Sequence, residues 1–210
     1  MKRPAPRGFT LVEMITVVAV IVILAGLVIS VSGLVMQKAS RARADGEIQV
    51  FKAKLDDYKR ENGSYPRDQY TDKLDPRLDV SPTSGKYLQA NLSMYSALTG
   101  DYLPENNPDG KPEKDSKVYY SFPRTQLSFT KDATGNPQNI RYISDPWGNA
   151  YGYSTAGAEL EAKYRADVRK DPKAARPTEL KGFNPTFDVW STAGANTLTQ
   201  KSKWVRNWSE

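Results

Sequence analysis

An uncharged stretch near the N-terminus constrains this chain more than any other feature. Residues 14–36 carry no charged side chain, and Glu13 is the only charge between residues 9 and 36. A helix needs about 20 apolar residues to cross a bilayer, so we expect a transmembrane helix over residues 9–36. Cations flank the stretch on both sides, so the positive-inside rule orients it only weakly. A secretory signal peptide would have a shorter apolar region, but small residues at 25–26 and 30–33 leave that interpretation open.

Glu13 is the residue in this stretch that needs an explanation. A carboxylate is costly at the centre of a membrane helix and less so near its end. In one interpretation Glu13 lies at the lipid headgroups and has no role. In the other it pairs with a cation inside an assembly, and a new N-terminal amine produced nearby would be such a partner.

The sequence RGFTLVE at residues 7–13, followed by the apolar run, resembles the prepilin-peptidase signal of type IV pilins and of type II secretion pseudopilins. The resemblance implies cleavage after Gly8, N-methylation of the new Phe9 amine and pairing of Glu13 with the N-terminal amine of a neighbouring subunit. Cleavage would lower the formal net charge from +6 to +3, because three of the cations lie in the leader. The basic excess therefore gives little support to nucleic-acid binding, and we expect none.

Residues 37–62 show the pattern of an amphipathic helix. Ile48, Phe51, Leu55 and Tyr58 recur at spacings of three, four and three residues, which places them on one helix face. The pair at 62–63, Asn then Gly, is a helix stop. We therefore predict one continuous helix over residues 9–62, with its apolar stripe facing a soluble domain.

The remaining residues, 63–210, contain short elements separated by many Pro and Gly residues. Periodicity and composition predict helices over 86–98 and 158–168. Strands are predicted over 117–122, 126–129, 140–143, 150–153 and 183–190, with a tight turn at 145–149.

Three segments of this part are similar to the major pseudopilin of type II secretion, namely 58–66, 145–153 and 187–195, and residues 207–208 resemble its closing residues. The resemblance implies an α+β, pilin-like fold in which a long N-terminal α-helix packs on a small antiparallel β-sheet with loop-rich insertions. Residues 67–139 and 156–181 are longer than that family needs.

The same resemblance raises the question of calcium, because the family's final loop usually holds that ion. Asn196 stands where the first aspartate ligand is expected, and residues 197–204 contain no acid. Calcium affinity depends on charged oxygen ligands, and Lys201 and Lys203 would oppose the ion. We therefore predict weak or absent calcium binding, and we expect no other cofactor.

Other chemistry finds little support in the sequence. The absence of Cys and His excludes cysteine nucleophiles and imidazole bases. The adjacent acids Asp56 and Asp57 diverge on a helix, so they form no shared acid–base site. No glycine-rich phosphate loop is present. The cations and aromatic residues of 201–208 suit phosphates, a partner subunit or packing onto the chain's own domain, and these alternatives remain open.

The sequence thus predicts a leader at 1–8, a transmembrane and assembly half-helix at 9–36, an amphipathic half-helix at 37–62 and a periplasmic domain at 63–210. We expect a non-enzymatic subunit of a type II secretion pseudopilus, anchored by a single pass in the inner membrane and then polymerised into a filament in the periplasm. Its expected partners are further copies of itself, minor pseudopilins, the inner-membrane assembly platform, prepilin peptidase and membrane lipid.

Two alternatives to the pseudopilus remain. A type IV pilin would serve adhesion, motility or DNA uptake, but surface pilins commonly carry a C-terminal disulfide, which the lack of Cys forbids. The other is a membrane-anchored periplasmic enzyme or binding module, for which the long region 67–139 is the best support.

Overall fold

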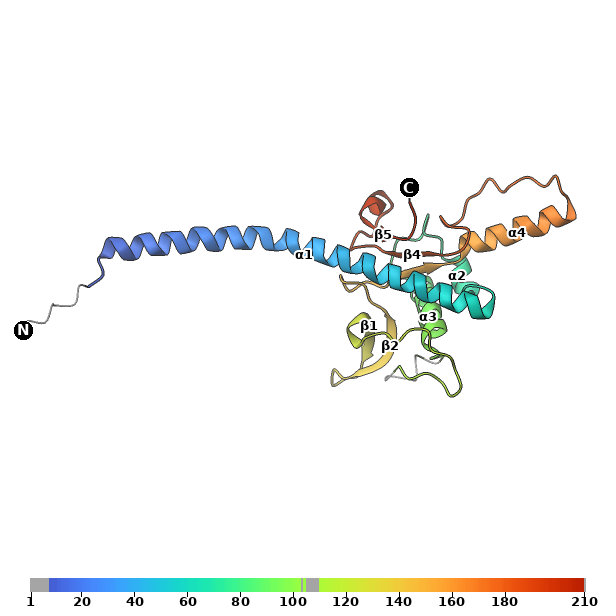
Figure 1. The fold of residues 1–210 in the computed structure, drawn as a ribbon, viewed down its shortest axis with the longest axis horizontal. Helices are drawn as coiled ribbons and strands as arrows, with labels where there is room; N and C mark the ends of the chain where they lie inside the picture. Colours follow the sequence, from blue (N-terminus) through green and yellow to red (C-terminus); the bar gives the residue numbers. More distant parts are fainter. Residues whose placement is uncertain (1–7, 103, 105–109, 210) are drawn as a thin grey trace, which may run out of the picture. The chain divides into compact units, whose positions relative to one another are not determined.

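The computed structural model describes residues 8–102, 104 and 110–209, and it describes no side chains at 28–32 and 34. Residues 1–7 of the expected leader therefore lie outside the described part. The chain divides into two compact units, Met1–Ser40 and Arg41–Glu210. The longest element is α1 (Leu11–Asn62), a helix of 52 residues that continues from the first unit into the second (Figure 1).

The bounds of α1 agree with the predicted helix at its C-terminal end and differ at its start. The helix begins at Leu11 rather than at Phe9, because Thr10 is its N-cap. It ends at Asn62, as predicted, and Gly63 follows in the left-handed region with φ at 77°. The Gly63 N–H donates to the carbonyl of Lys59 over 2.8 Å, which satisfies one of the last carbonyls of the helix.

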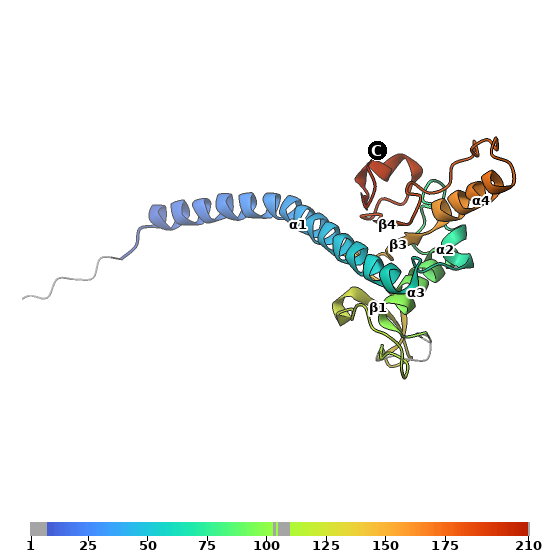
Figure 2. The same cartoon turned by 45° about the vertical axis from the view of Figure 1, so that its right-hand side comes forward.

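The second unit is α+β, which confirms the predicted fold class. Its helical elements after α1 are α2 (Gln69–Lys73), α3 (Gly85–Thr99), η1 (Arg124–Gln126), α4 (Ala156–Lys170) and η2 (Leu198–Lys203). Its strands are β1 (Leu127–Lys131), β2 (Pro137–Ile143), β3 (Gly152–Ser154), β4 (Asp188–Ser191) and β5 (Val205–Arg206). These form two antiparallel sheets in place of the one expected, β1-β2 and β3-β4-β5, which Figure 2 shows apart from each other.

Two predicted strands are corrected by the structure. Residues 117–122 form no strand, because the N–H groups of Tyr119 and Tyr120 both donate to the carbonyl of Leu98 at the end of α3. The strand predicted from residue 183 begins only at Asp188, since the preceding backbone turns to bind the Asp188 carboxylate. The helices α2, η1 and η2 and the short strand β5 were not predicted.

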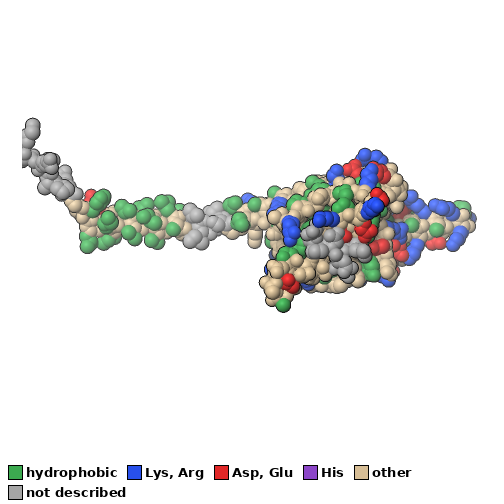
Figure 3. Space-filling model, turned by 90° about the horizontal axis from the view of Figure 1, so that it is seen from below, with side chains coloured by type: hydrophobic (Ala, Val, Ile, Leu, Met, Phe, Trp, Pro, Cys, Tyr) green, Lys and Arg blue, Asp and Glu red, His purple; other side chains and the backbone are tan. Residues whose placement is uncertain are grey.

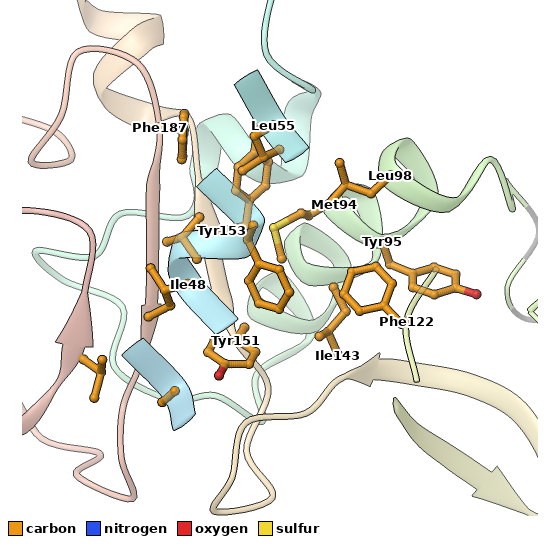
Figure 4. Close-up of a cluster of buried hydrophobic side chains, with 14 of the residues drawn as sticks. Ile48, Leu55, Met94, Tyr95, Leu98, Phe122, Ile143, Tyr151, Tyr153 and Phe187 are labelled. Atoms are coloured by element: carbon orange, nitrogen blue, oxygen red, sulfur yellow. The ribbon is translucent and has the colours of Figure 1, made fainter. Parts of the chain in front are cut away.

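The apolar stripe of α1 forms the centre of the main core. Ile48, Phe51 and Leu55 are fully buried, as the spacing predicts. Figure 4 shows Ile48 and Leu55 in a cluster with side chains of α3, β2, β3 and the residue before β3, namely Met94, Leu98, Ile143, Tyr153 and Tyr151. The rings of Phe51 and Tyr151 meet edge to face, with centroids 5.2 Å apart. The predicted fourth member, Tyr58, is only partly buried and packs on the ring of Tyr119.

A second core cluster is built around tryptophans. Trp190 of β4 stacks on Trp204 with centroids 5.9 Å apart and meets Trp208 edge to face at 5.8 Å. Tyr87 of α3 closes the cluster from another side, 5.5 Å from Trp190. Trp204 and Trp208 are buried, so the C-terminal tail packs onto its own domain, which decides among the alternatives left open for residues 201–208.

The two segments 145–153 and 187–195 meet in the fold. The Ser191 hydroxyl donates to the buried Asp145 carboxylate over 2.5 Å, and that carboxylate also accepts from the backbone N–H groups of Trp147 and Asn149. Gly152 of β3 pairs with Trp190, and a Cβ atom added to Gly152 would lie 2.2 Å from the indole ring. The Asp145 carboxylate therefore holds the tight turn at 145–149, and the absence of a side chain at Gly152 allows the Trp190 indole to pack against the β3 backbone.

A buried asparagine joins α3 to the strands. The Asn91 side-chain oxygen accepts from the N–H of Ile143 over 2.7 Å, and its amide donates to the carbonyls of Ile143 and Tyr151. Asn91 is fully buried, so its side chain provides hydrogen-bond partners for backbone groups of Ile143, at the end of β2, and of Tyr151, just before β3.

Asp188 organises the loop before β4. It is fully buried, and its oxygens accept from the N–H groups of Phe183 (2.8 Å) and Asn184 (2.9 Å). Burial raises the pKa of Asp188 from 3.8 to about 6; the hydrogen bonds oppose this rise, and the nearby charge of Asp75 adds to it. The loop is therefore held by a carboxyl group that titrates near neutrality.

The contact at Gly152 predicts a stability effect. Gly152→Ala forces the indole of Trp190 to shift, and overpacking of this kind should lower the free energy of unfolding by about 1–3 kcal/mol. Urea unfolding of the full chain in detergent, followed by tryptophan fluorescence, measures this. Gly46→Ala is the matched control, because Gly46 is exposed within α1 with open space around it and should gain about 0.5–1 kcal/mol. An unchanged midpoint for Gly152→Ala would contradict the packing described.

The Asp188 carboxyl predicts a pH dependence of stability. Its pKa is higher in the folded chain than in the unfolded chain, so the folded state binds the proton more tightly. The unfolding free energy should therefore rise as pH falls from 7.5 to 5, by up to about 1.4 kcal/mol per pH unit, and this gain is lost as pH rises through about 6. Asp188→Asn should flatten the dependence. A stability that falls over the same window in the parent chain would contradict the assignment.

Candidate processing and assembly site

The Gly8–Phe9 peptide bond lies in an open, non-helical segment before α1. Residues 8–10 are exposed and belong to no helix or strand. A Cβ atom at Gly8 would meet nothing within 4 Å, and the Phe9 side chain is 77% exposed. A peptidase that binds an extended backbone can therefore reach this bond without unfolding α1.

Glu13 sits in the first turn of α1 and caps it. Its Oε2 atom accepts from the backbone N–H of Thr10 over 2.8 Å and from the Thr10 hydroxyl over 2.8 Å. In return the Glu13 N–H donates to the Thr10 Oγ1 over 3.3 Å. This is a capping box, in which the N-cap residue and the third helical residue satisfy each other's backbone donors.

The capping role was not foreseen, although its signal is present in the sequence. Thr10 and Glu13 have the Thr-x-x-Glu spacing of a capping box. The second carboxylate oxygen of Glu13, Oε1, has no hydrogen-bond partner among the residues that the structure describes. One oxygen therefore fixes the start of the helix while the other remains open to a cation.

The first half of α1 presents an apolar surface. Every large apolar side chain described between Phe9 and Met36 is more than half exposed, from 52% at Val17 to 77% at Phe9. Figure 3 shows these side chains along the helix, with the undescribed side chains in grey. Contiguous exposed apolar surface of this kind marks a site of contact with protein or lipid.

A transmembrane helix was expected over residues 9–36. In the part of the chain that the structure describes, no helix is long and apolar enough to cross a membrane.

Asn196 lies in the loop between β4 and η2, where its side chain is exposed. The loop is held by the Trp204 indole, which donates to the carbonyl of Ala195 over 2.8 Å. It is also held by the Lys201 ammonium, which donates to the carbonyl of Arg77 over 2.5 Å. Burial lowers the pKa of Lys201, and the charge of Asp75 opposes this shift. The described residues contain no group of three or more acidic side chains placed to hold a metal ion.

Comparison with known proteins places the N-terminal segment in a recognised class. Residues 3–29 match the prokaryotic N-terminal methylation motif, a range that contains Gly8, Phe9 and Glu13. The chain is 29% identical over 163 residues to the type II secretion system core protein G of Pseudomonas aeruginosa, covering 76% of this chain and 80% of that protein. The corresponding protein of Klebsiella michiganensis is 34% identical over 90 residues, which cover 42% of this chain and 63% of that protein.

The chain is similar to the pseudopilins of type II secretion. This confirms the resemblance found in the sequence. No solved structure gives a significant match. The methylation motif coincides with the open Gly8–Phe9 bond and the capped start of α1.

The loop around Asn196 predicts the response to calcium. Asn196 offers only an exposed amide, and the Lys201 ammonium, which is bonded to the Arg77 carbonyl, adds a positive charge. Calcium should therefore produce no saturable heat in calorimetry up to millimolar concentration. The unfolding midpoint should be the same in calcium and in chelator. Micromolar binding that is lost in Asn196→Ala would contradict this.

Proposed function

We propose that this chain is a structural subunit of a type II secretion pseudopilus. Prepilin peptidase cleaves it after Gly8, the new Phe9 amine is methylated, and the mature subunits polymerise through α1 to support protein export across the outer membrane. The observation that carries the proposal is the methylation motif over residues 3–29, combined with an apolar half-helix whose described large apolar side chains are all more than half exposed. The role is structural rather than catalytic.

Before assembly, we place the subunit in the inner membrane as a single-pass protein, with residues 63–210 in the periplasm. Lipid would then cover the apolar side chains that are exposed between Phe9 and Met36. Assembly exchanges lipid for the helices of neighbouring copies, so the apolar surface stays covered throughout.

Glu13 sets how far each subunit is shifted along its neighbour in the filament. An unpaired carboxylate among packed apolar helices is costly, whereas one that meets an amine is neutralised. In the proposal, the free Oε1 atom of Glu13 accepts from the Phe9 amine of a neighbouring subunit while Oε2 keeps its two bonds to Thr10. The other expected contacts are with minor pseudopilins and the inner-membrane assembly platform.

The two roles of Glu13 can be separated by substitution. Glu13→Gln keeps a side-chain oxygen for the Thr10 cap and removes the charge, whereas Thr10→Ala removes the cap and keeps the charge. We expect Glu13→Gln and Glu13→Ala to be cleaved normally and to lose filaments, and Thr10→Ala to retain them. Sheared-filament yield and cross-linking of α1 between subunits measure the outcome. Normal filaments from Glu13→Gln would contradict charge pairing.

The cleavage proposal is tested at Gly8. Gly8→Val places a branched side chain beside the Phe9 peptide bond and should leave an uncut precursor on a gel, with no N-methylated Phe9 in the mass spectrum of the N-terminal peptide. Gly26→Ala is the matched control, because Gly26 lies within α1 with open space around it. Normal maturation of Gly8→Val would contradict the assigned site.

A further inference from the structure

The segment 156–181 builds one wall of a groove on the second unit. The groove has a volume of about 450 Å³ and lies between the last turn of α1, the chain that follows it, α4 and the loop before β4. Its lining combines cations, small apolar side chains and hydroxyl groups, with side chains from Lys59, Ser64, Tyr65, Arg67, Thr155, Ala158, Glu161, Ala162, Arg165, Arg169, Pro185 and Thr186.

The groove is basic. Lys59, Arg67, Arg165 and Arg169 line it, against the single acid Glu161. Two of these cations have partners, because Arg67 pairs with Asp72 over 2.7 Å and Arg165 pairs with Glu161 over 2.9 Å.

Lys59 and Arg169 have no carboxylate partner among the residues that the structure describes. The Lys59 ammonium lies 4.6 Å from the centre of the Tyr65 ring, so it is held over the groove by an aromatic face and not by an acid. The two cations come from two different elements, α1 and α4. The groove therefore receives a cation without a carboxylate partner from each of these helices.

The first turn of α4, which begins one wall of the groove, is packed tightly against the rest of the second unit. A Cβ atom at Gly157 would lie 2.1 Å from the carbonyl oxygen of Asn184, so the first turn of α4 packs directly on the backbone before β4. Ala156 and Gly157 are buried, whereas most side chains further along the helix are exposed. The start of α4 is therefore anchored to the rest of the second unit.

The spacing of the α4 cations suits an extended chain. Arg165 and Arg169 are one helical turn apart, which separates them by about 6 Å along the axis. Alternate residues of an extended strand repeat at about 6.6 Å, so two acidic side chains at alternate positions match the two guanidinium groups. Ala158, Ala162 and Pro185 supply apolar contacts for such a chain between its charges.

We propose that this groove binds an extended acidic segment of a partner protein, with Asp or Glu at alternate positions. An arginine can take a carboxylate through two parallel hydrogen bonds, and two arginines on successive turns fix the register of the segment. Arg165 donates only its Nε–H to Glu161, which leaves its terminal N–H groups for the segment. Apolar side chains in the lining, together with cations from both α1 and α4, favour a polypeptide over a polysaccharide sulfate or phosphate. This inference stands apart from the contacts proposed for the apolar first half of α1, since none of the groove residues lies before Lys59.

The test uses the full chain in detergent micelles and a fluorescent peptide with Glu at every second position and Thr between. Fluorescence anisotropy should show saturable binding, and the same peptide with Gln in place of Glu should not bind. Lys59→Gln combined with Arg169→Gln should weaken binding by roughly tenfold, which corresponds to about 0.7 kcal/mol for each of two exposed ion pairs. Lys170→Gln combined with Lys173→Gln is the matched control, because both residues are exposed and neither lines the groove.

The control variant should bind the peptide within about twofold of the parent chain. Equal loss in the control and groove variants would overturn the proposal, because binding would then follow net charge alone. Binding of dextran sulfate that depends on Lys59 and Arg169, without binding of the Glu peptide, would overturn it in favour of an anionic polysaccharide. Because the assay reads peptide binding alone, its outcome is independent of whether filaments form.

Discussion

The apolar surface on the first half of α1 is the constraint on which the rest of the account depends. Side chains from Phe9 to Met36 that would form the interior of a soluble protein are more than half exposed wherever the structure describes them. Exposure of a continuous apolar surface of this kind to water is unfavourable, so we expect lipid or other protein to cover it. The second half of the same helix differs, since Ile48, Phe51 and Leu55 are buried in the core of the second unit.

Polar groups decide how the second unit is organised around that core. The buried Asp145 joins the turn at 145–149 to Ser191, and the buried Asp188 holds the loop before β4. Asn91 joins α3 to the strands through three hydrogen bonds. The sheets are small, so these side chains supply many of the contacts that a longer ladder would supply in a larger domain.

The sequence predicts the helices better than the strands, for physical reasons. The stripe of Ile48, Phe51 and Leu55 repeats with the helical period, and the stop at Asn62 is local, so both were predicted correctly. The segment 117–122 has strand-like composition, but its backbone bonds to the end of α3, a contact that sequence alone does not encode. Close approaches such as Gly152 against Trp190 depend on the tertiary fold and were likewise missed.

At the N-terminus the motif identified Gly8, Phe9 and Glu13 from their pattern alone, and the matched methylation motif covers all three. The capping bond between Thr10 and Glu13 also has a local signal, the Thr-x-x-Glu spacing of a capping box. The most direct test of the central claim compares the extracellular proteome of an in-frame deletion strain with that of its parent. We expect particular exported proteins to disappear from the medium and to accumulate in the periplasm, and an unchanged extracellular proteome would contradict the proposed function.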